Sequence, residues 1–285
     1  MNKILILAAS TLILYSCKKN GGNSGGSNPP PNDTAKCVLT GETTTLLGNE
    51  ASWTYEYNDK GIPVKITKRN RYDQIESTTD ISSSGTTILR DQNKIGTSYN
   101  YNNAQGDIFA GYPTSSDVSI TIGTLEQRNY YHYTFGYDAK HRLTGVSEHT
   151  NTVTNDNEWD LTVSYDDHDN VTGLRYEWST GPRNEITIIK ATAYDDKPTP
   201  YAGVKGWKFL SSFAWDNYDP EPILTALSAH NPMEFTMGTT DHPNQEHRTI
   251  TYTYNEKGFP LERANKHNNR GTESNWKQTF TYNCK

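Results

Sequence analysis

The residues best suited to binding chemistry lie in the segment "AWDNYDPEP", which runs from Ala214 to Pro222. An aromatic ring can stack on the apolar face of a sugar, and nearby carboxylates can accept hydrogen bonds from its hydroxyl groups. We therefore treat this segment as a candidate glycan-binding site, the alternative being that its rings only fill the mouth of the fold. The candidate side chains are Trp215, Asp216, Tyr218, Asp219 and Glu221.

Other patterns that could support catalysis or metal binding have simpler explanations. "GNSGG", Gly22 to Gly26, matches the pattern around a hydrolase nucleophile, but that pattern acts only between a strand and a helix. "DDHDN", Asp166 to Asn170, offers oxygen ligands for calcium, although its position in a turn already explains these residues. None of the eight histidines lies in a zinc-binding spacing. We predict no catalytic residue, no metal site and no cofactor.

The N-terminus predicts export and lipid attachment. Lys3 supplies positive charge, and the apolar run Ile4 to Tyr15 has the length of a signal-peptide core, too short to span a bilayer. The run ends in Leu14-Tyr15-Ser16-Cys17, which resembles the lipobox of bacterial lipoproteins. We predict a signal peptide over residues 1–16 and lipidation of Cys17, the alternative being an ordinary secretory signal. Several acyl chains on one cysteine anchor a protein stably, whereas one chain is marginal.

A linker over residues 17–36 is expected between this anchor and the folded domain. Its Gly, Ser and Asn residues followed by three prolines are typical of a flexible tether that stiffens at its far end. Within the linker, "DTA", Asp33 to Ala35, resembles the short O-glycosylation acceptor of Bacteroidota, with Thr34 as the modified residue. Residues 37–285 are then expected to form a single domain, a length that all-β domains reach.

The composition indicates an ordered domain with an aromatic core and a polar exterior. Apolar residues make up only 33% of the chain and the mean hydropathy is −0.84, but the chain contains 19 Tyr, 7 Phe and 6 Trp. Each of these aromatic side chains can bury a large area. The net charge of −6, with no basic stripe, argues against nucleic acid as a partner.

Two further cysteines, Cys37 and Cys284, lie at the two edges of the predicted domain. In an oxidising compartment two remaining cysteines commonly pair, so we expect a disulfide that closes almost the whole domain. The alternative is a pair of free thiols.

One short pattern recurs along the chain. "YEYNDKGIPVKI" begins at Tyr55, and related stretches begin at Phe135, Val163 and Tyr252. Apolar and polar residues alternate on both sides of a central turn, which is the pattern of a half-buried strand. Each copy therefore predicts a β-hairpin whose aromatic residues face a core.

The turn within each copy has a specific chemistry. In "NDKG", Asn58 can bond the backbone just after it, and Gly61 can adopt a positive φ without steric cost. His141 and Asp169 stand at the glycine position in two other copies, and both residue types are enriched at positive φ.

The spacing of the copies predicts the size of the sheet. Tyr137, Tyr165 and Tyr194 are 28 and 29 residues apart, and Tyr254 and Tyr282 are 28 apart. Two strands with their connections fit this length, which predicts an all-β meander of roughly 14–18 antiparallel strands. Because open sheets rarely exceed about ten strands, we expect it to curl or close into a soluble barrel-like shell. The interruption of the pattern after Val204 predicts one or two short helices near 205–230.

Two resemblances follow from these motifs. "YDAKHRLTGV" resembles the YD repeat of Rhs-type toxin shells, apart from the missing glycine in its turn. The lipobox, the tether, "WTYEYNDKGIPVKI", "AYDDKPTPYAG", "LSAHNP" and "TYTYNEKGFPLER", in this order, resemble Bacteroidota lipoproteins of the "domain of unknown function 4595" family. That family is described as porin-like in fold and its function is unassigned. The resemblance implies a fold and a location and supplies no catalytic residue.

These observations favour a lipid-anchored envelope protein that is not an enzyme and serves as a binding or structural module. The alternatives are a glycan-binding or glycan-processing lipoprotein and a carrier of a small hydrophobic ligand inside the shell. The face opposite the aromatic residues carries Thr, Glu, Lys and Ser, unlike the aliphatic band of an outer-membrane porin. We therefore expect only Cys17 to touch the outer membrane, with the domain facing the periplasm or, alternatively, the cell surface. A glycan or a protein is the expected partner, and the sequence indicates no oligomeric state.

Overall fold

The computed structural model describes residues 37–46, 48–82, 85–90, 95–99, 115–122, 125–150, 157–180, 183–204, 220–242 and 244–284. The predicted signal peptide, the linker, Cys17 and Thr34 lie outside the described residues, as do four residues of the candidate glycan site, Trp215, Asp216, Tyr218 and Asp219.

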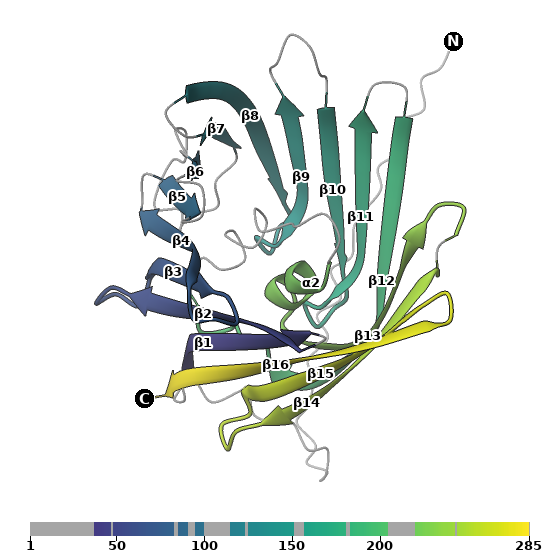
Figure 1. The fold of residues 1–285 in the computed structure, drawn as a ribbon. Coiled ribbons are helices and arrows are strands. Elements are labelled where there is room, and N and C mark those ends of the chain that lie inside the picture. Colours follow the sequence, from purple (N-terminus) through teal and green to yellow (C-terminus); the bar gives the residue numbers. More distant parts are fainter. Residues whose placement is uncertain are drawn as a thin grey trace, which may run out of the picture. The chain divides into compact units, whose positions relative to one another are not determined.

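The described residues form sixteen strands and one helix (Figure 1). The strands are β1 (Cys37–Leu46), β2 (Asn49–Tyr57), β3 (Pro63–Arg69), β4 (Ile75–Ser82), β5 (Gly85–Arg90), β6 (Ile95–Tyr99), β7 (Ser115–Ile122), β8 (Leu125–Tyr137), β9 (Leu143–Thr150), β10 (Asn157–Tyr165), β11 (Val171–Thr180), β12 (Arg183–Pro198), β13 (His230–Thr239), β14 (Glu246–Tyr254), β15 (Pro260–Asn269) and β16 (Thr272–Cys284). The helix is α2 (Glu221–Leu227). Among the described residues, no helix combines the length and the apolar character needed to cross a membrane.

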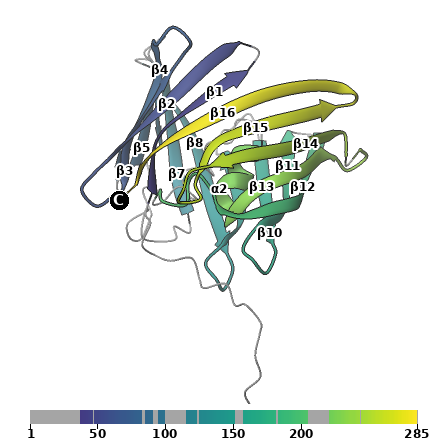
Figure 2. The ribbon, with the colours of Figure 1, turned by 90° about the horizontal axis from the view of Figure 1, so that it is seen from below.

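The sheet is an antiparallel meander in which each strand pairs with its neighbours along the chain. The last strand, β16, also pairs with β1, and Figure 2 shows these two strands side by side. The strand order therefore describes a ring. Its shortest pairing, between β6 and β7, consists of one residue pair, Ser98 with Ser119. This confirms the predicted all-β meander of 14–18 strands curled into a barrel-like shell, with one short helix in the predicted window.

The disulfide joins the strands at which the ring closes. Cys37 and Cys284 are bonded and are directly opposite each other in the β1–β16 pairing. The predicted disulfide is confirmed.

The repeated turn has the predicted chemistry. Asn58 Oδ1 accepts hydrogen bonds from the backbone N–H groups of Lys60 and Ile62, at 3.0 and 3.1 Å, and Gly61 has a φ of 71°. Asp138, Asp166 and Asn255 cap their turns in the same way. The residues that follow at the left-handed position are His141 (φ 60°), Asp169 (φ 65°) and Gly258 (φ 81°).

A tyrosine locks several of these hairpins, which the sequence pattern alone does not reveal. The hydroxyl of Tyr57 donates to the carbonyl oxygen of Leu39 at 2.6 Å, and the hydroxyl of Tyr165 donates to that of Leu143 at 2.8 Å. Tyr282 makes the equivalent bond to Pro260 at 2.8 Å. The recurring tyrosine therefore combines a partly buried ring with a hydrogen bond to a neighbouring strand.

The left-handed turns lead to a first prediction. Replacing His141 with glycine should raise the free energy of unfolding by about 0.5–1 kcal/mol, because the strain of positive φ exceeds the extra chain entropy of glycine. The reverse change, Gly61→Ala, should lower it by a similar amount, since a Cβ there would meet no atom within 4 Å and only the backbone angle is at issue. Urea unfolding of both variants measures the difference. Equal stability of both variants and the wild type would contradict the argument.

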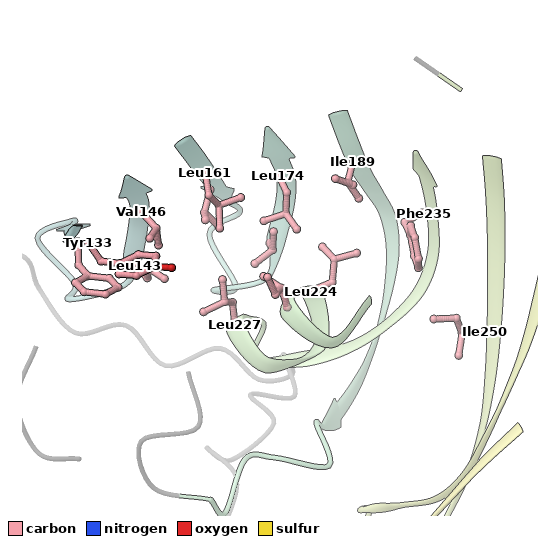
Figure 3. Packing of buried hydrophobic residues seen from close by; sticks show 14 residues of the cluster. Tyr133, Leu143, Val146, Leu161, Leu174, Ile189, Leu224, Leu227, Phe235 and Ile250 are labelled. Carbon is pink, nitrogen blue, oxygen red and sulfur yellow. The ribbon is translucent and has the colours of Figure 1, made fainter. Parts of the chain in front are cut away.

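The aromatic rows point inward, as predicted, and form two clusters. The larger cluster packs β8 to β14 against Ile223, Leu224 and Leu227 of α2 (Figure 3). The smaller cluster contains Leu39, Tyr55, Tyr201, Val204 and Phe280. Alternate positions on the same strands, such as Thr162, Thr251 and Lys266, are exposed and polar. The inner face of the sheet is thus the buried one, and α2 lies against it.

Candidate ligand-binding site on the inner face of the sheet

A row of aromatic and acidic side chains crosses four neighbouring strands. The register pairs Tyr133 of β8 with Glu148 of β9, Glu148 with Trp159 of β10, and Trp159 with Trp178 of β11. Directly opposite residues of an antiparallel sheet share one face, so these four side chains are on the inner face together. Tyr176 lies two residues before Trp178 on β11 and therefore on the same face. We call these five residues the Glu148 row.

The rings of the Glu148 row touch in sequence. The ring centroids of Tyr133 and Trp159 are 6.0 Å apart with a 66° angle between planes, and those of Trp159 and Tyr176 are 5.3 Å apart at 39°. Tyr176 and Trp178 continue the series at 6.2 Å and 74°. Edge-to-face and tilted contacts of this kind hold each ring in a fixed orientation. Trp159 and Trp178 remain partly exposed.

Glu148 places a carboxyl group among these rings. Glu148 is 9% exposed, and the Tyr133 hydroxyl donates a hydrogen bond to Oε2 of Glu148. Burial raises the pKa of Glu148, although hydrogen bonds from Tyr133 and Trp159 act in the opposite direction. Trp178 contributes a buried Nε1–H group that has no hydrogen-bond partner among the described residues. The row therefore combines ring faces, one carboxyl group and one indole donor.

Glu221, predicted as a ligand-binding residue, is the first residue of α2 and is fully buried. Its Oε1 is 2.6 Å from Nη1 of Arg263 on β15, and its Oε2 is 3.7 Å from Nη1 of Arg248 on β14. Asn265 also donates to Oε1 at 3.4 Å. The carboxylate of Glu221 is thus used to hold α2 against the sheet and is withdrawn from solvent.

Arg263 connects this ion pair to a second carboxyl group. Its guanidinium lies 5.0 Å from the ring centroid of Trp276. Burial favours its neutral form, but the charge of Glu221, together with those of Tyr252, Tyr201 and Glu42, raises the pKa of Arg263. Glu42 of β1 accepts hydrogen bonds from Tyr55 at 2.7 Å and Gln278 at 2.8 Å, and burial raises the pKa of Glu42. The positive charge of Arg263 acts on Glu42 in the opposite direction and lowers its pKa, which links the two carboxyl groups electrostatically.

A serine, a histidine and a glutamate also lie in series on the inner face. Ser274 Oγ is 3.4 Å from Nδ1 of His267, and Nε2 of His267 is 2.8 Å from Glu246 Oε2. Ser274 and His267 line a pocket of about 480 Å³. A serine nucleophile needs its base within about 2.6–3.2 Å and an oxyanion site beside it. Ser274 instead sits in a regular strand opposite His267, so cross-strand pairing explains the contact.

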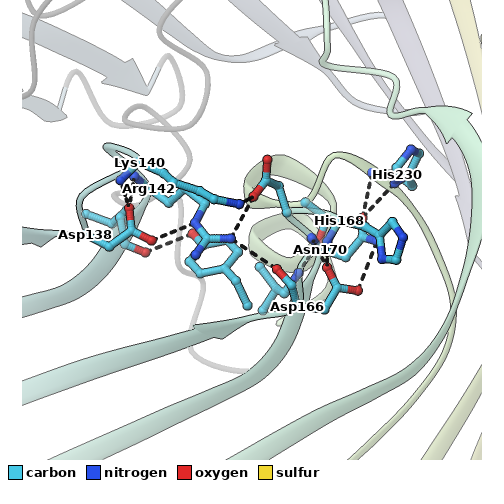
Figure 4. A network of polar contacts seen from close by, with 12 residues as sticks. Asp138, Lys140, Arg142, Asp166, His168, Asn170 and His230 are labelled. Atoms are coloured by element: carbon cyan, nitrogen blue, oxygen red, sulfur yellow. Dashed lines mark hydrogen bonds and ion pairs between the residues drawn. The ribbon is translucent and has the colours of Figure 1, made fainter. Parts of the chain in front are cut away.

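The turn between β8 and β9 and the turn between β10 and β11 form a charged network (Figure 4). This network explains the residues of the "DDHDN" segment. Asp166 Oδ1 accepts the backbone N–H groups of its own turn, while Asp169 Oδ1 is 2.7 Å from Arg142 Nη1 and 2.9 Å from Lys140 Nζ. Asn170 accepts a hydrogen bond from the backbone N–H of His230 at 3.0 Å. These carboxylates therefore serve the turns, and among the described residues no group of three or more acidic, His or Cys side chains is placed to hold a metal ion.

Sequence reasoning missed the Glu148 row, although one signal was present. Val146 and Glu148 have the same parity on β9, so an acidic residue occupies a position where the pattern calls for an apolar one. Only the register shows that this carboxyl group stands between Tyr133 and Trp159.

Comparisons with known proteins support the fold. No protein-family model matches the chain, and no curated protein matches it. A porin-like protein from Bacteroides uniformis matches with a TM-score of 0.53 and 17% identity, over 86% of this chain and 98% of that one. A porin-like protein from Bacteroides vulgatus matches with a TM-score of 0.54 and 10% identity, over the same shares. At such identities the likeness establishes the fold alone, and membership of the "domain of unknown function 4595" family, like the YD-repeat resemblance, stays a prediction.

Proposed function

We propose that this protein is a lipid-anchored component of the outer membrane that binds a ligand on the inner face of its curled sheet without transforming it. The observation that carries the proposal is the Glu148 row, where partly exposed rings, a carboxyl group and an indole donor that has no partner in the described part of the chain lie together. Ligand sites are usually concave and largely apolar, with a few convergent polar groups. The inner face of a curled sheet offers this combination.

The envelope location is supported by several independent features. The solved structures that share the fold are porin-like proteins of Bacteroides, and the Cys37–Cys284 disulfide suits an oxidising compartment. The sequence from Lys3 to Cys17 has the form of a lipoprotein signal. Lys18-Lys19-Asn20 lacks the acidic run that resembles a surface-export tag, which favours the periplasmic side. Thr34 in the linker stays our predicted O-glycosylation site.

The anchor is tested by fractionating cells of a Bacteroides host that express the full chain. Wild type should sediment with the membranes and enter solution only with detergent, whereas Cys17→Ala should not sediment. Wild type recovered in the soluble fraction would overturn the proposed anchor. Intact mass of the same preparation reports both the acyl chains and any glycan on Thr34.

Ligand binding is tested by native mass spectrometry of the same full-length protein. A bound molecule of defined mass should accompany wild type and be depleted in Trp159→Ala, a variant that removes the central ring of the Glu148 row. Tyr72→Ala is the matched control, because Tyr72 is 65% exposed on a turn far along the sequence from the row. A second candidate function, the carriage of a hydrophobic ligand inside the shell, would be recognised by a co-purified lipid. Wild type without any bound or binding molecule would contradict both.

A further inference from the structure

We infer that the Glu148 row is a saccharide-binding subsite; this rests on the proposed function and names the class of ligand. The inference is independent of the segment from Trp215 to Asp219, because it uses only side chains on strands β8 to β11.

The rings supply the stacking surface that a sugar needs. A pyranose ring presents axial C–H groups on its faces and hydroxyl groups around its edge, so it packs flat against an aromatic ring while its hydroxyls bond sideways. Trp159 lies at the centre of the row, 5.3 Å from Tyr176 and 6.0 Å from Tyr133 between ring centroids. These contacts fix the ring of Trp159 before any ligand arrives, which reduces the entropy that binding must overcome.

The polar groups select against a purely hydrocarbon ligand. Trp178 Nε1–H is buried without an acceptor among the described residues, and a hydrocarbon placed against it would leave it so. A buried donor without a partner is costly, so the site favours a ligand that carries an oxygen acceptor. A saccharide presents several hydroxyl groups, so one can accept from Trp178 while another donates its proton to the carboxylate oxygens of Glu148.

The same groups select against a cationic ligand. Aromatic cages with a carboxylate bind quaternary ammonium groups by cation–π attraction. Such a cation cannot accept a hydrogen bond from Trp178, and the buried Glu148 already receives the Tyr133 hydroxyl. A neutral hydroxylated ring can satisfy Trp178 and Glu148 together, whereas a quaternary ammonium such as tetramethylammonium satisfies neither hydrogen bond.

The experiment is a calorimetric titration of the full-length protein in detergent. Four hexasaccharides are used, each built from one sugar: glucose, mannose, xylose or N-acetylglucosamine. Tetramethylammonium and a medium-chain fatty acid are titrated in parallel. Wild type should bind at least one saccharide. Trp178→Phe keeps a ring but loses the N–H group, and should weaken that binding by up to about tenfold, the worth of one hydrogen bond. Trp159→Ala should weaken it by at least that factor, and Glu148→Gln should weaken it measurably.

Two controls make the outcomes distinct. Tyr72→Ala should bind like wild type, and near-ultraviolet circular dichroism should show that Trp178→Phe is folded. Saccharide binding that is unchanged in all three row variants, or that is lost only in Trp215→Ala, overturns the inference. Binding of tetramethylammonium or fatty acid in place of saccharide also overturns it but leaves the proposed function intact. Failure of every titration, together with an empty native mass spectrum, removes the proposed function itself.

Discussion

Replacing Arg263 with methionine is expected to lower the free energy of unfolding by about 3–5 kcal/mol, which is large against the roughly 5–15 kcal/mol of a typical domain. Arg263 is the near partner of Glu221, at 2.6 Å, and Glu221 is fully buried. Without Arg263 the carboxylate keeps the more distant Arg248 guanidinium, 3.7 Å away, as a countercharge. The loss is therefore mainly the cost of a buried charge left poorly compensated. Urea unfolding of wild type and variant gives the difference directly.

The matched control is Lys266→Met on the same strand. Lys266 pairs with Glu273 at 3.0 Å, but both side chains are more than half exposed, at 58% and 51%. Exposed pairs contribute about 0–1 kcal/mol, so this variant should unfold close to wild type. The double variant Glu221→Gln/Arg263→Met should recover part of the loss, since it removes both charges. If Arg263→Met costs no more than Lys266→Met, the Glu221 ion pair does not hold α2 in place.

The ion pair also explains how so short a helix persists. α2 has 7 residues, no side-chain cap and a proline in its first turn. Isolated helices below about 12–15 residues are marginal in water, so packing must supply the stability. The apolar side of α2 fits the cluster around Phe235, while Glu221 bonds to β14 and β15. Together these contacts attach α2 to strands β8 to β15.

The hairpins could be predicted because their chemistry is local. An Asn or Asp that caps the turn and a residue able to take positive φ are separated by only three positions, as in Asn58 and Gly61. The alternation of apolar and polar residues on each strand is equally local. The expectation that the meander curls or closes follows from its strand number, and the disulfide follows from two cysteines at the domain edges.

The candidate site could not be predicted because it depends on register and on contacts between distant residues. The place of Glu148 between Tyr133 and Trp159 is set by how β9 aligns with β8 and β10. The short segment that Glu221 shares with Trp215 predicts a ligand-binding role for it, but its partner is Arg263, a residue of β15. Neighbours in sequence gave no sign of a partner more than forty residues away.

Removing the disulfide is the second change with a large expected effect. The double variant Cys37→Ala/Cys284→Ala should lose about 2–5 kcal/mol, because the bond closes a loop with a sequence separation of 247 residues. On the chain-entropy model a loop of this length is worth roughly 5 kcal/mol, and partial structure in the unfolded chain reduces that value. For a domain of this size, each kcal/mol shifts the melting temperature by about 2–4 °C. Differential scanning calorimetry should therefore record a fall on the order of 10 °C.

Reduction provides the control for this variant. A thiol reductant should lower the melting temperature of wild type to that of the double variant and should leave the double variant unchanged, since Cys37 and Cys284 are bonded only to each other. Hydrogen exchange should rise first in β1 and β16, because these strands join the two chain ends and the disulfide spans their pairing. A thiol assay on the unfolded, unreduced domain that detects two free thiols would contradict the disulfide. Equal melting temperatures with and without reductant would show instead that the ring of strands holds its closing pair without the bond.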